Sequence, residues 1–215
     1  MSVEDEKRLA AHAAAEMVRD GMRVGLGTGT TVAYLLAALS RLRPRVVYVA
    51  TSPGTEHSAR SLGLMVEPFD TLDFLDLAID GADQALESGW LIKGGGGAHT
   101  REKIAAASAE RFVVIGDSTK LVDELRAPVP LELHAFGVAA TLRRLAPSSL
   151  RDVDLSPDGG VIADYLGEIT DPQALNARLS MTPGVVEHGI FSPRLTSEIL
   201  IAKGATVHRL DIGAT

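Results

Sequence analysis

Short apolar segments alternate with helical patterns through the first part of the chain, and this alternation limits the fold more than any other feature. The expected strands lie at 22–27, 45–50, 65–69, 75–80, 90–97 and 111–117, and the expected helices at 4–19, 32–42, within 51–64 and from 99 onward. Nearly continuous apolar strands are typical of parallel sheets, where crossover helices cover both faces. The pattern therefore predicts an α/β fold with a Rossmann-like parallel sheet.

The pattern changes near Ala127, where two prolines follow closely. The expected order is then strand 129–134, helix 135–145, strand 150–155, strand 160–167, helix 171–180 and strand 184–190. This β-α-β-β-α-β order is ferredoxin-like, and Ser-Pro-Asp-Gly-Gly at 156–160 has the composition of a hairpin turn. We expect a larger α/β sheet domain of residues 1–126 plus 199–215, and a smaller α+β domain of residues 127–198. The tail from Ser197 is expected to add a helix or loop and a last strand to the first domain.

Many of the 21 glycines lie where expected strands end. The first cluster is Gly25-Leu26-Gly27-Thr28-Gly29-Thr30-Thr31, between a strand and a helix. Glycines let backbone approach a ligand closely, and a helix N-terminus offers free N–H groups to an anion. A tight strand-to-helix turn is the alternative interpretation, and the cluster alone does not decide between the two.

The second cluster is Lys93-Gly94-Gly95-Gly96-Gly97. Four consecutive glycines lose much conformational entropy on ordering, which favours a position where a ligand comes close to the backbone. Glu102 falls in the first turn of the next expected helix, where an exposed glutamate that favours the helix dipole is the alternative.

Two further polar loops follow apolar strands. Asp80-Gly81-Ala82-Asp83 follows one, and Gly116-Asp117-Ser118-Thr119-Lys120 follows another. In open α/β sheets, ligands bind beyond the carboxyl ends of the strands, although such residues can also simply cap a turn. If all four loops meet at one edge of a parallel sheet, they bring together carboxylates and lysines that can move protons on a small phosphorylated substrate.

Composition excludes several classes of function. The net charge of −7 argues against nucleic acid as a partner. There is no cysteine, the six histidines are scattered, and no G-x-S-x-G elbow is present, so we expect no metal site, thiolate chemistry or serine hydrolase. The charged start MSVEDEKRLA is unlike a signal peptide, and no apolar run is long enough to span a membrane. We therefore expect a cytoplasmic protein with no membrane partner.

Seven segments together resemble the ribose-5-phosphate isomerase family, type A, and they occur in that family's order along the whole chain. They are Gly27–Thr31, Thr51-Ser52 with Thr55-Glu56, Asp80–Asp83, Lys93–Gly96, Arg101–Lys103, Asp117–Lys120 and Pro183–Gly189. The resemblance implies interconversion of D-ribose 5-phosphate and D-ribulose 5-phosphate in the non-oxidative pentose phosphate pathway. It also implies no metal or organic cofactor, and a homodimer.

The resemblance also implies residue roles. Glu102 matches the general base, which moves a proton between C2 and C1 through a cis-enediol(ate). Asp80, Asp83 and Lys93 match the residues that open the sugar ring, shuttle the hydroxyl proton and stabilise the oxyanion. The matched substrate-binding residues are Lys7, Thr28, Gly29, Thr30, Thr31, Gly81, Ala82, Gly94, Gly95, Gly96 and Lys120, among which Lys7, Thr30, Thr31 and Lys120 match phosphate contacts.

Three positions depart from the family pattern: Gln84 where glutamate is common, Thr30 where serine is common, and His99 where an apolar residue is usual. Two alternatives stay open. One is a non-catalytic domain that senses sugar phosphates, which would keep the phosphate loop without needing Glu102. The other is an isomerase for a different aldose phosphate, such as a six-carbon one.

Overall fold

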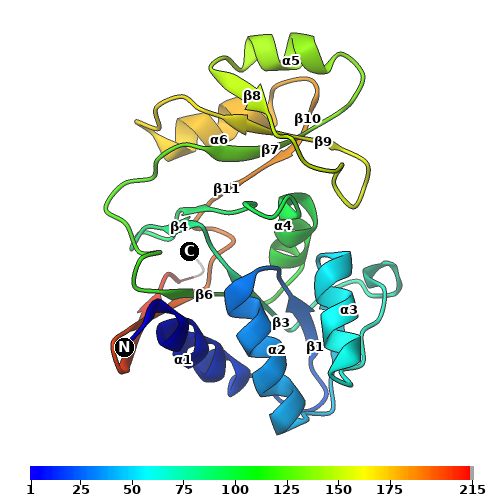
Figure 1. Cartoon of the computed structure of the whole chain (residues 1–215), viewed down its shortest axis with the longest axis vertical. Coiled ribbons are helices and arrows are strands. Elements are labelled where there is room, and N and C mark those ends of the chain that lie inside the picture. Colours follow the sequence, from blue (N-terminus) through cyan, green and yellow to red (C-terminus); the bar gives the residue numbers. More distant parts are fainter. Residues whose placement is uncertain (214–215) are drawn as a thin grey trace.

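A six-stranded sheet forms the larger part of the molecule (Figure 1). The structure is a computed structural model, and it describes residues 1–213. The sheet order is β13-β12-β6-β3-β1-β2, with β1 (Arg23–Leu26), β2 (Val47–Ala50), β3 (Leu77–Gly81), β6 (Phe112–Asp117), β12 (Glu198–Lys203) and β13 (Thr206–Asp211). All neighbouring strands in this sheet are parallel, except that β13 is antiparallel to β12. The expected parallel α/β sheet is confirmed.

Alternate residues of these strands face two different cores. Ile79 packs with the helices α1 (Val3–Ala15), α2 (Thr30–Leu42) and α3 (Pro53–Ser61), whereas its neighbour Ala78 packs on the opposite face with α4 (His99–Ala107). The core is built mainly of aliphatic side chains and alanines, which suits the small number of aromatic residues. Among residues 1–213, no helix is long and apolar enough to cross a membrane.

A smaller four-stranded antiparallel sheet lies above the first in Figure 1, with its helices on the outside. Its elements are β7 (Val129–Leu133), α5 (Val138–Arg144), β8 (Ser148–Leu150), β9 (Val161–Tyr165), α6 (Pro172–Ser180) and β10 (Val185–His188). The order β10-β7-β9-β8 is the ferredoxin-like arrangement. Ser156 and Gly160 close the expected turn through the Ser156 N–H and the Gly160 carbonyl, 2.8 Å apart.

A third, three-stranded sheet lies between these two and was not foreseen. It contains β4 (Gln84–Ala85), β5 (Leu91–Ile92) and β11 (Ile190–Phe191), all antiparallel. The segment 90–97 was expected to be a strand of the parallel sheet, and this was wrong. Only Leu91 and Ile92 form a strand. An apolar run this short does not indicate which sheet the strand will join.

Three further expectations about elements were wrong. Segment 65–69 forms no strand, because only Val66 makes a single bridge, to Tyr48, before the short 3₁₀ helix η1 (Phe69–Thr71). β8 ends at Leu150, so residues 151–155 form a loop instead of a strand. The tail forms two strands, β12 and β13, and not a helix or loop with one strand, since EILIAK is buried beside β6.

The order of the strands creates a crevice at one edge of the large sheet. β1 leads through α2 to β2 on one side, while β3 leads to β6 on the other side. Loops that leave neighbouring strands in opposite directions open a space between them at the carboxyl ends. The loops after β1 and β3 carry Gly27–Thr31 and Asp80–Asp83, so the topology places two of the predicted segments there.

Candidate active site

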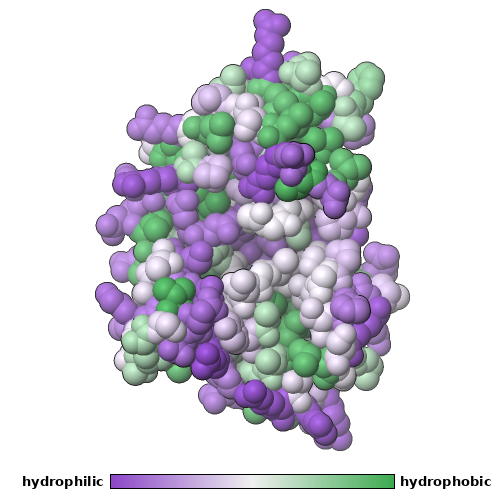
Figure 2. Space-filling view, viewed as in Figure 1, coloured by the Kyte–Doolittle hydropathy of each residue, from purple (hydrophilic) through white to green (hydrophobic). Residues whose placement is uncertain are grey.

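A small polar cavity of about 150 Å³ lies at this edge of the sheet. It is lined by Thr28, Gly29, Thr30, Thr31, Gly81, Ala82, Asp83, Lys93, Gly94, Gly95, Gly96, Glu102 and Lys120. The structure therefore brings together all but two of the site residues predicted from the sequence. Asp80 lies behind the lining, in contact with Lys93, and Lys7 is not among the lining residues. Figure 2 shows a band of intermediate hydropathy across the middle of this face, between the two larger parts of the molecule.

Three charged side chains meet at the base of the cavity. Nζ of Lys93 lies 2.7 Å from Oδ2 of Asp80 and 3.2 Å from Oε2 of Glu102, and it donates to the Gly81 carbonyl at 2.6 Å. Each of the three side chains is at most 4 % exposed. The interpretation of Glu102 as an exposed surface glutamate is therefore excluded. A buried cation between two buried carboxylates is typical of an active site, where catalytic groups often have shifted pKa values.

The pKa values of these groups follow from their burial. Burial raises the pKa of Glu102 to about 7, Asp80 adds to the rise, and Lys93 acts against it. Burial lowers the pKa of Lys93, but the attraction of Asp80 and Glu102 outweighs this and the net shift is upward. Burial raises the pKa of Asp80, opposed by Lys93 and by the N–H groups of Thr28 and Gly81. Lys93 thus stays charged, and Glu102 exchanges its proton near neutral pH.

The Glu102 carboxylate lies between Lys93 and the cavity. Its Oε2 is buried and lies 3.2 Å from Nζ of Lys93, as an ion pair without an aligned hydrogen bond. This attraction favours the ionised form of the carboxylate and opposes the effect of burial. Glu102 also lines the cavity, so a bound molecule can reach the carboxylate group.

Glycine is required beside Asp80. A Cβ atom on Gly27 would lie 1.8 Å from Cγ of Asp80, so no other residue fits at this position. The space it leaves lets the Asp80 carboxylate accept hydrogen bonds from the N–H groups of Thr28 at 3.0 Å and Gly81 at 2.7 Å. The end of β1 thereby fixes the carboxylate that holds Lys93.

Asp83 behaves differently from Asp80. Its side chain is exposed to solvent at the mouth of the cavity, and Oδ2 accepts the N–H of Gly95 at 2.8 Å. This hydrogen bond links the loop after β3 to the glycine loop after β5. Asp83 is therefore a solvent-accessible carboxylate that can exchange protons with a molecule in the cavity.

The opposite end of the cavity suits an anion. α2 begins there at Gly29, whose φ of 117° favours glycine and which provides no side-chain cap. The first N–H groups of α2 therefore point outward unsatisfied beside the hydroxyl-bearing Thr30 and Thr31. Lys120 also lines this cavity, and no carboxylate among residues 1–213 forms an ion pair with it.

Thr28 has a structural role that the sequence does not specify. Its hydroxyl lies 2.9 Å from that of Ser52, 3.1 Å from that of Thr51 and 3.3 Å from that of Thr55. These four hydroxyls form a buried cluster beneath the loop. The cluster explains why Thr51, Ser52 and Thr55 recur with the glycine loop in the resemblance: they hold the start of the anion-binding turn.

The predicted loop 116–120 and the predicted phosphate contact Lys7 have mixed outcomes. Asp117 accepts the N–H of Thr119 at 3.0 Å and so caps the turn, as the alternative interpretation proposed. Glu6 accepts Ser118 Oγ at 2.7 Å, which ties α1 to this turn. Lys7 pairs with Glu4 at 2.7 Å, so its role as a phosphate contact stays a prediction.

Two of the three departures from the family pattern have defined surroundings in the structure. Gln84 donates to the Arg126 carbonyl at 2.7 Å and accepts its N–H at 2.8 Å, a pairing that a glutamate carboxylate cannot make in full. His99 is fully buried, and burial lowers its pKa to about 3, so it is neutral. Its ring lies against Gly94, where a Cβ would approach it to 2.7 Å.

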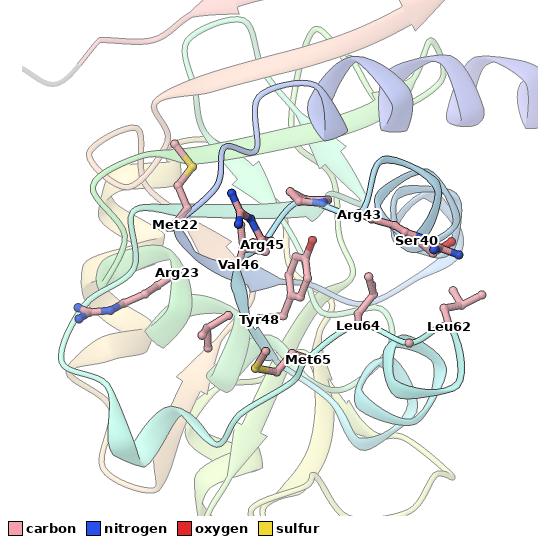
Figure 3. A pocket seen from close by; sticks show the side chains of 14 residues that line it. Met22, Arg23, Ser40, Arg43, Arg45, Val46, Tyr48, Leu62, Leu64 and Met65 are labelled. Carbon is pink, nitrogen blue, oxygen red and sulfur yellow. The ribbon is translucent and has the colours of Figure 1, made fainter.

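A larger cavity, of about 700 Å³, lies elsewhere (Figure 3). It opens at the amino ends of β1 and β2, lined by Met22, Arg23, Arg45, Tyr48, Leu64 and others, with no carboxylate among its lining residues. It therefore lacks an acid or base of the kind that Glu102 and Asp83 provide. Among residues 1–213, no group of three or more His, Cys, Asp or Glu side chains is placed to hold a metal ion.

Comparison with known proteins identifies the family of the chain. The family model of ribose 5-phosphate isomerase A (phosphoriboisomerase A) matches residues 47–206. Ribose-5-phosphate isomerase A of Rhodopseudomonas palustris (strain BisB18) is 44% identical over 211 residues, covering 89% of this chain and 91% of the relative. The protein of that name from Gluconobacter oxydans is 43% identical over 216 residues, covering 91% of this chain and 92% of the relative.

Solved structures show the same fold. Ribose 5-phosphate isomerase A from Neisseria gonorrhoeae superposes with a TM-score of 0.94 at 29% identity, covering 99% of this chain and 98% of that one. A D-ribose-5-phosphate isomerase in complex with phospho-erythronic acid superposes with a TM-score of 0.91 at 33% identity, covering 98% and 100%. From its sequence, its fold and these relatives, the chain belongs to the ribose-5-phosphate isomerase A family.

Proposed function

We propose that this protein interconverts D-ribose 5-phosphate and D-ribulose 5-phosphate, with Glu102 as the general base. The observation that carries the proposal is the buried carboxylate of Glu102, with a pKa of about 7, on the wall of a cavity that is also lined by Lys93 and Lys120. A base works best when its pKa lies near the working pH.

In this mechanism, Glu102 takes the proton from C2 of the open-chain aldose, and the electron pair moves to form the C1–C2 double bond of a cis-enediol(ate). The same carboxyl group then returns the proton to C1, while a proton passes between the two hydroxyl oxygens and gives the ketose. Atoms and charge balance without an added oxidant. Because the base acts at both carbons, it must lie over the C1–C2 bond.

The neighbouring groups would stabilise the charge that develops. Lys93 is an ammonium held in place by Asp80 at 2.7 Å, so it needs no reorganisation when an oxyanion forms nearby. Asp83, exposed at the mouth, would exchange the hydroxyl proton and assist opening of the sugar ring. Lys120, Thr30, Thr31 and the first N–H groups of α2 would bind the phosphate, which supplies binding energy remote from the reacting carbons.

A direct assay tests this function. The purified protein is incubated with ribose 5-phosphate, with and without EDTA, and ribulose 5-phosphate is measured. We expect turnover that EDTA leaves unchanged. An inactive folded protein that still binds the sugar phosphate would favour the sensor alternative, although burying a glutamate such as Glu102 has no evident purpose in a sensor. Parallel assays with six-carbon aldose phosphates decide the substrate range.

The resemblance supports further proposals about context. We propose a cytoplasmic homodimer acting in the non-oxidative pentose phosphate pathway, and light scattering measures the mass in solution.

We also propose that residues 1–126 with 199–215 form the catalytic domain and residues 127–198 the smaller one. This division is supported by the separate six-stranded and four-stranded sheets.

A further inference from the structure

Arg151 connects the four-stranded sheet to the glycine loop of the active site. It follows β8, and its Nη1 donates to the carbonyl of Gly94 at 3.2 Å and to that of Gly95 at 3.0 Å. Neither the motifs nor the resemblance singled out this residue. It contacts the loop from outside the small polar cavity and instead lines a neighbouring cleft of about 570 Å³.

The guanidinium group is itself held firmly. Asp164 on β9 accepts its Nε and its Nη2, each at 2.6 Å. The two side chains are only 18% and 14% exposed. A paired, two-point contact of this kind fixes both the position and the plane of the guanidinium, so the remaining N–H group is directed at the loop.

The two carbonyl contacts fix the direction of two backbone donors. In a trans peptide the carbonyl and the following N–H point in opposite directions. Because Arg151 holds the Gly94 and Gly95 carbonyls, the N–H groups of Gly95 and Gly96 point away from it. The Gly95 N–H reaches Asp83 at 2.8 Å. The Gly96 N–H has no acceptor among residues 1–213, and Gly96 lines the active cavity.

The loop has one internal hydrogen bond, from the Gly97 N–H to the Gly94 carbonyl at 3.0 Å, and its other contacts come from neighbouring residues. Gly94 and Gly97 have φ values of 99° and 74°, which only glycine adopts easily, and a run of four glycines has many other conformations available. On one side the loop packs against the buried ring of His99. On another side the guanidinium of Arg151 restrains the carbonyls of Gly94 and Gly95.

We propose that Arg151 is a positioning residue, which holds the Gly94–Gly97 loop so that the Gly96 N–H is a preformed donor to the substrate's reacting oxygen. This rests on the proposed isomerase function. The guanidinium has a second effect: a cation bound to a carbonyl polarises that peptide and makes its N–H a stronger donor. Through Arg151, the four-stranded sheet therefore contributes to transition-state stabilisation without touching the substrate.

The test compares Arg151→Lys, Arg151→Ala and Asp164→Asn with the control Asp158→Asn. Asp158 forms an ion pair with Arg101 at 2.6 Å between the same two parts of the molecule, but touches neither glycine carbonyl. Misplacing a catalytic donor by about 1 Å costs up to roughly 100-fold. We therefore expect kcat to fall about 10- to 100-fold in Arg151→Lys and Arg151→Ala, with KM changed less than about threefold, since the phosphate contacts are separate.

Chemical rescue tests whether the guanidinium group itself is required at this position. Arg151→Ala leaves a gap beside the cleft, so added ethylguanidine is expected to restore part of the lost kcat, while ethylammonium does not. A folded Arg151→Lys with wild-type kcat overturns the proposal, as does loss of kcat in Asp158→Asn equal to that in Arg151→Lys. If Arg151→Ala does not fold, the Arg151→Lys result decides alone. Failure of the wild-type enzyme to isomerise ribose 5-phosphate would instead overturn the proposed function.

Discussion

Glu102 and Lys93 approach each other to 3.2 Å between Oε2 and Nζ, yet they do not form an aligned hydrogen bond. Lys93 directs its aligned hydrogen bonds to Asp80 and to the Gly81 carbonyl. The ammonium is therefore held by Asp80, while its attraction opposes the rise that burial causes in the pKa of Glu102. This division of roles leads to the first two predictions.

The first prediction concerns the pH dependence of the reaction. The general base must be ionised, and the pKa of Glu102 is raised to about 7. We expect kcat/KM to rise with pH and level off above about 7, and to fall about tenfold per unit below it. The profile is measured by initial rates, and Asp158→Asn is expected to show the same profile. A constant kcat/KM from about pH 5.5 to 8 in a folded enzyme would contradict the assignment.

The second prediction concerns stability. Since the folded pKa of Glu102 lies above the ordinary glutamate value of 4.5, the folded state binds more protons than the unfolded state between these values. This group's contribution to stability is therefore lost as pH rises through that window. We expect Glu102→Gln to raise Tm at pH 8 and to raise it less at pH 5. Thermal unfolding by circular dichroism measures both, and an equal or larger gain at pH 5 would be inconsistent with a buried carboxylate of raised pKa.

The third prediction concerns the phosphate end. Lys120 lines the cavity without a carboxylate partner among the described residues. Loss of one charged hydrogen bond costs on the order of 1.5–3 kcal/mol, so Lys120→Ala is expected to raise KM about tenfold or more with little change in kcat. Arg41→Ala, an exposed change in the last turn of α2, controls for general charge effects. A wild-type KM would remove Lys120 from the phosphate site.

The fourth prediction concerns Gly94. A Cβ there would lie 2.7 Å from His99, and the φ of 99° strains any other residue. We expect Gly94→Ala to lower Tm and to reduce kcat about 100-fold, because the loop must move. Adding His99→Ala relieves the contact but leaves the backbone strain, so only part of the loss returns. Gly54→Ala, where an added Cβ meets nothing within 4 Å, is the matched control, and equal effects at both positions would refute this explanation.

Much of the site could be predicted from the sequence because parallel strands bring their carboxyl ends together. Asp80, Asp83 and Lys120 follow apolar segments, so a local pattern and one topological rule suffice to gather them. Lys93 was also foreseen, but for a partly wrong reason, since β5 belongs to the small antiparallel sheet and not to the parallel one. The glycine loop, residues 94–97, follows β5 and therefore reaches the cavity from the three-stranded sheet.

The remaining residues could not be found in this way. Arg151 follows β8 and Asp164 lies on β9. Arg151 meets both Asp164 and Gly94 only in the folded molecule, at sequence separations that no local pattern records. The burial of His99 likewise depends on packing that a single sequence does not show. These contacts are tertiary, whereas strand ends, glycine runs and turn residues are local signals.

The central claim is that Glu102 transfers the proton. The most direct measurement is turnover of ribose 5-phosphate by Glu102→Gln, together with calorimetric binding of phospho-erythronic acid, the ligand of a solved relative. The variant keeps the shape of the side chain and removes the base. We predict that kcat falls by at least about 100-fold while the ligand still binds within about tenfold of its wild-type affinity. Near-wild-type isomerisation by a folded Glu102→Gln would contradict the account.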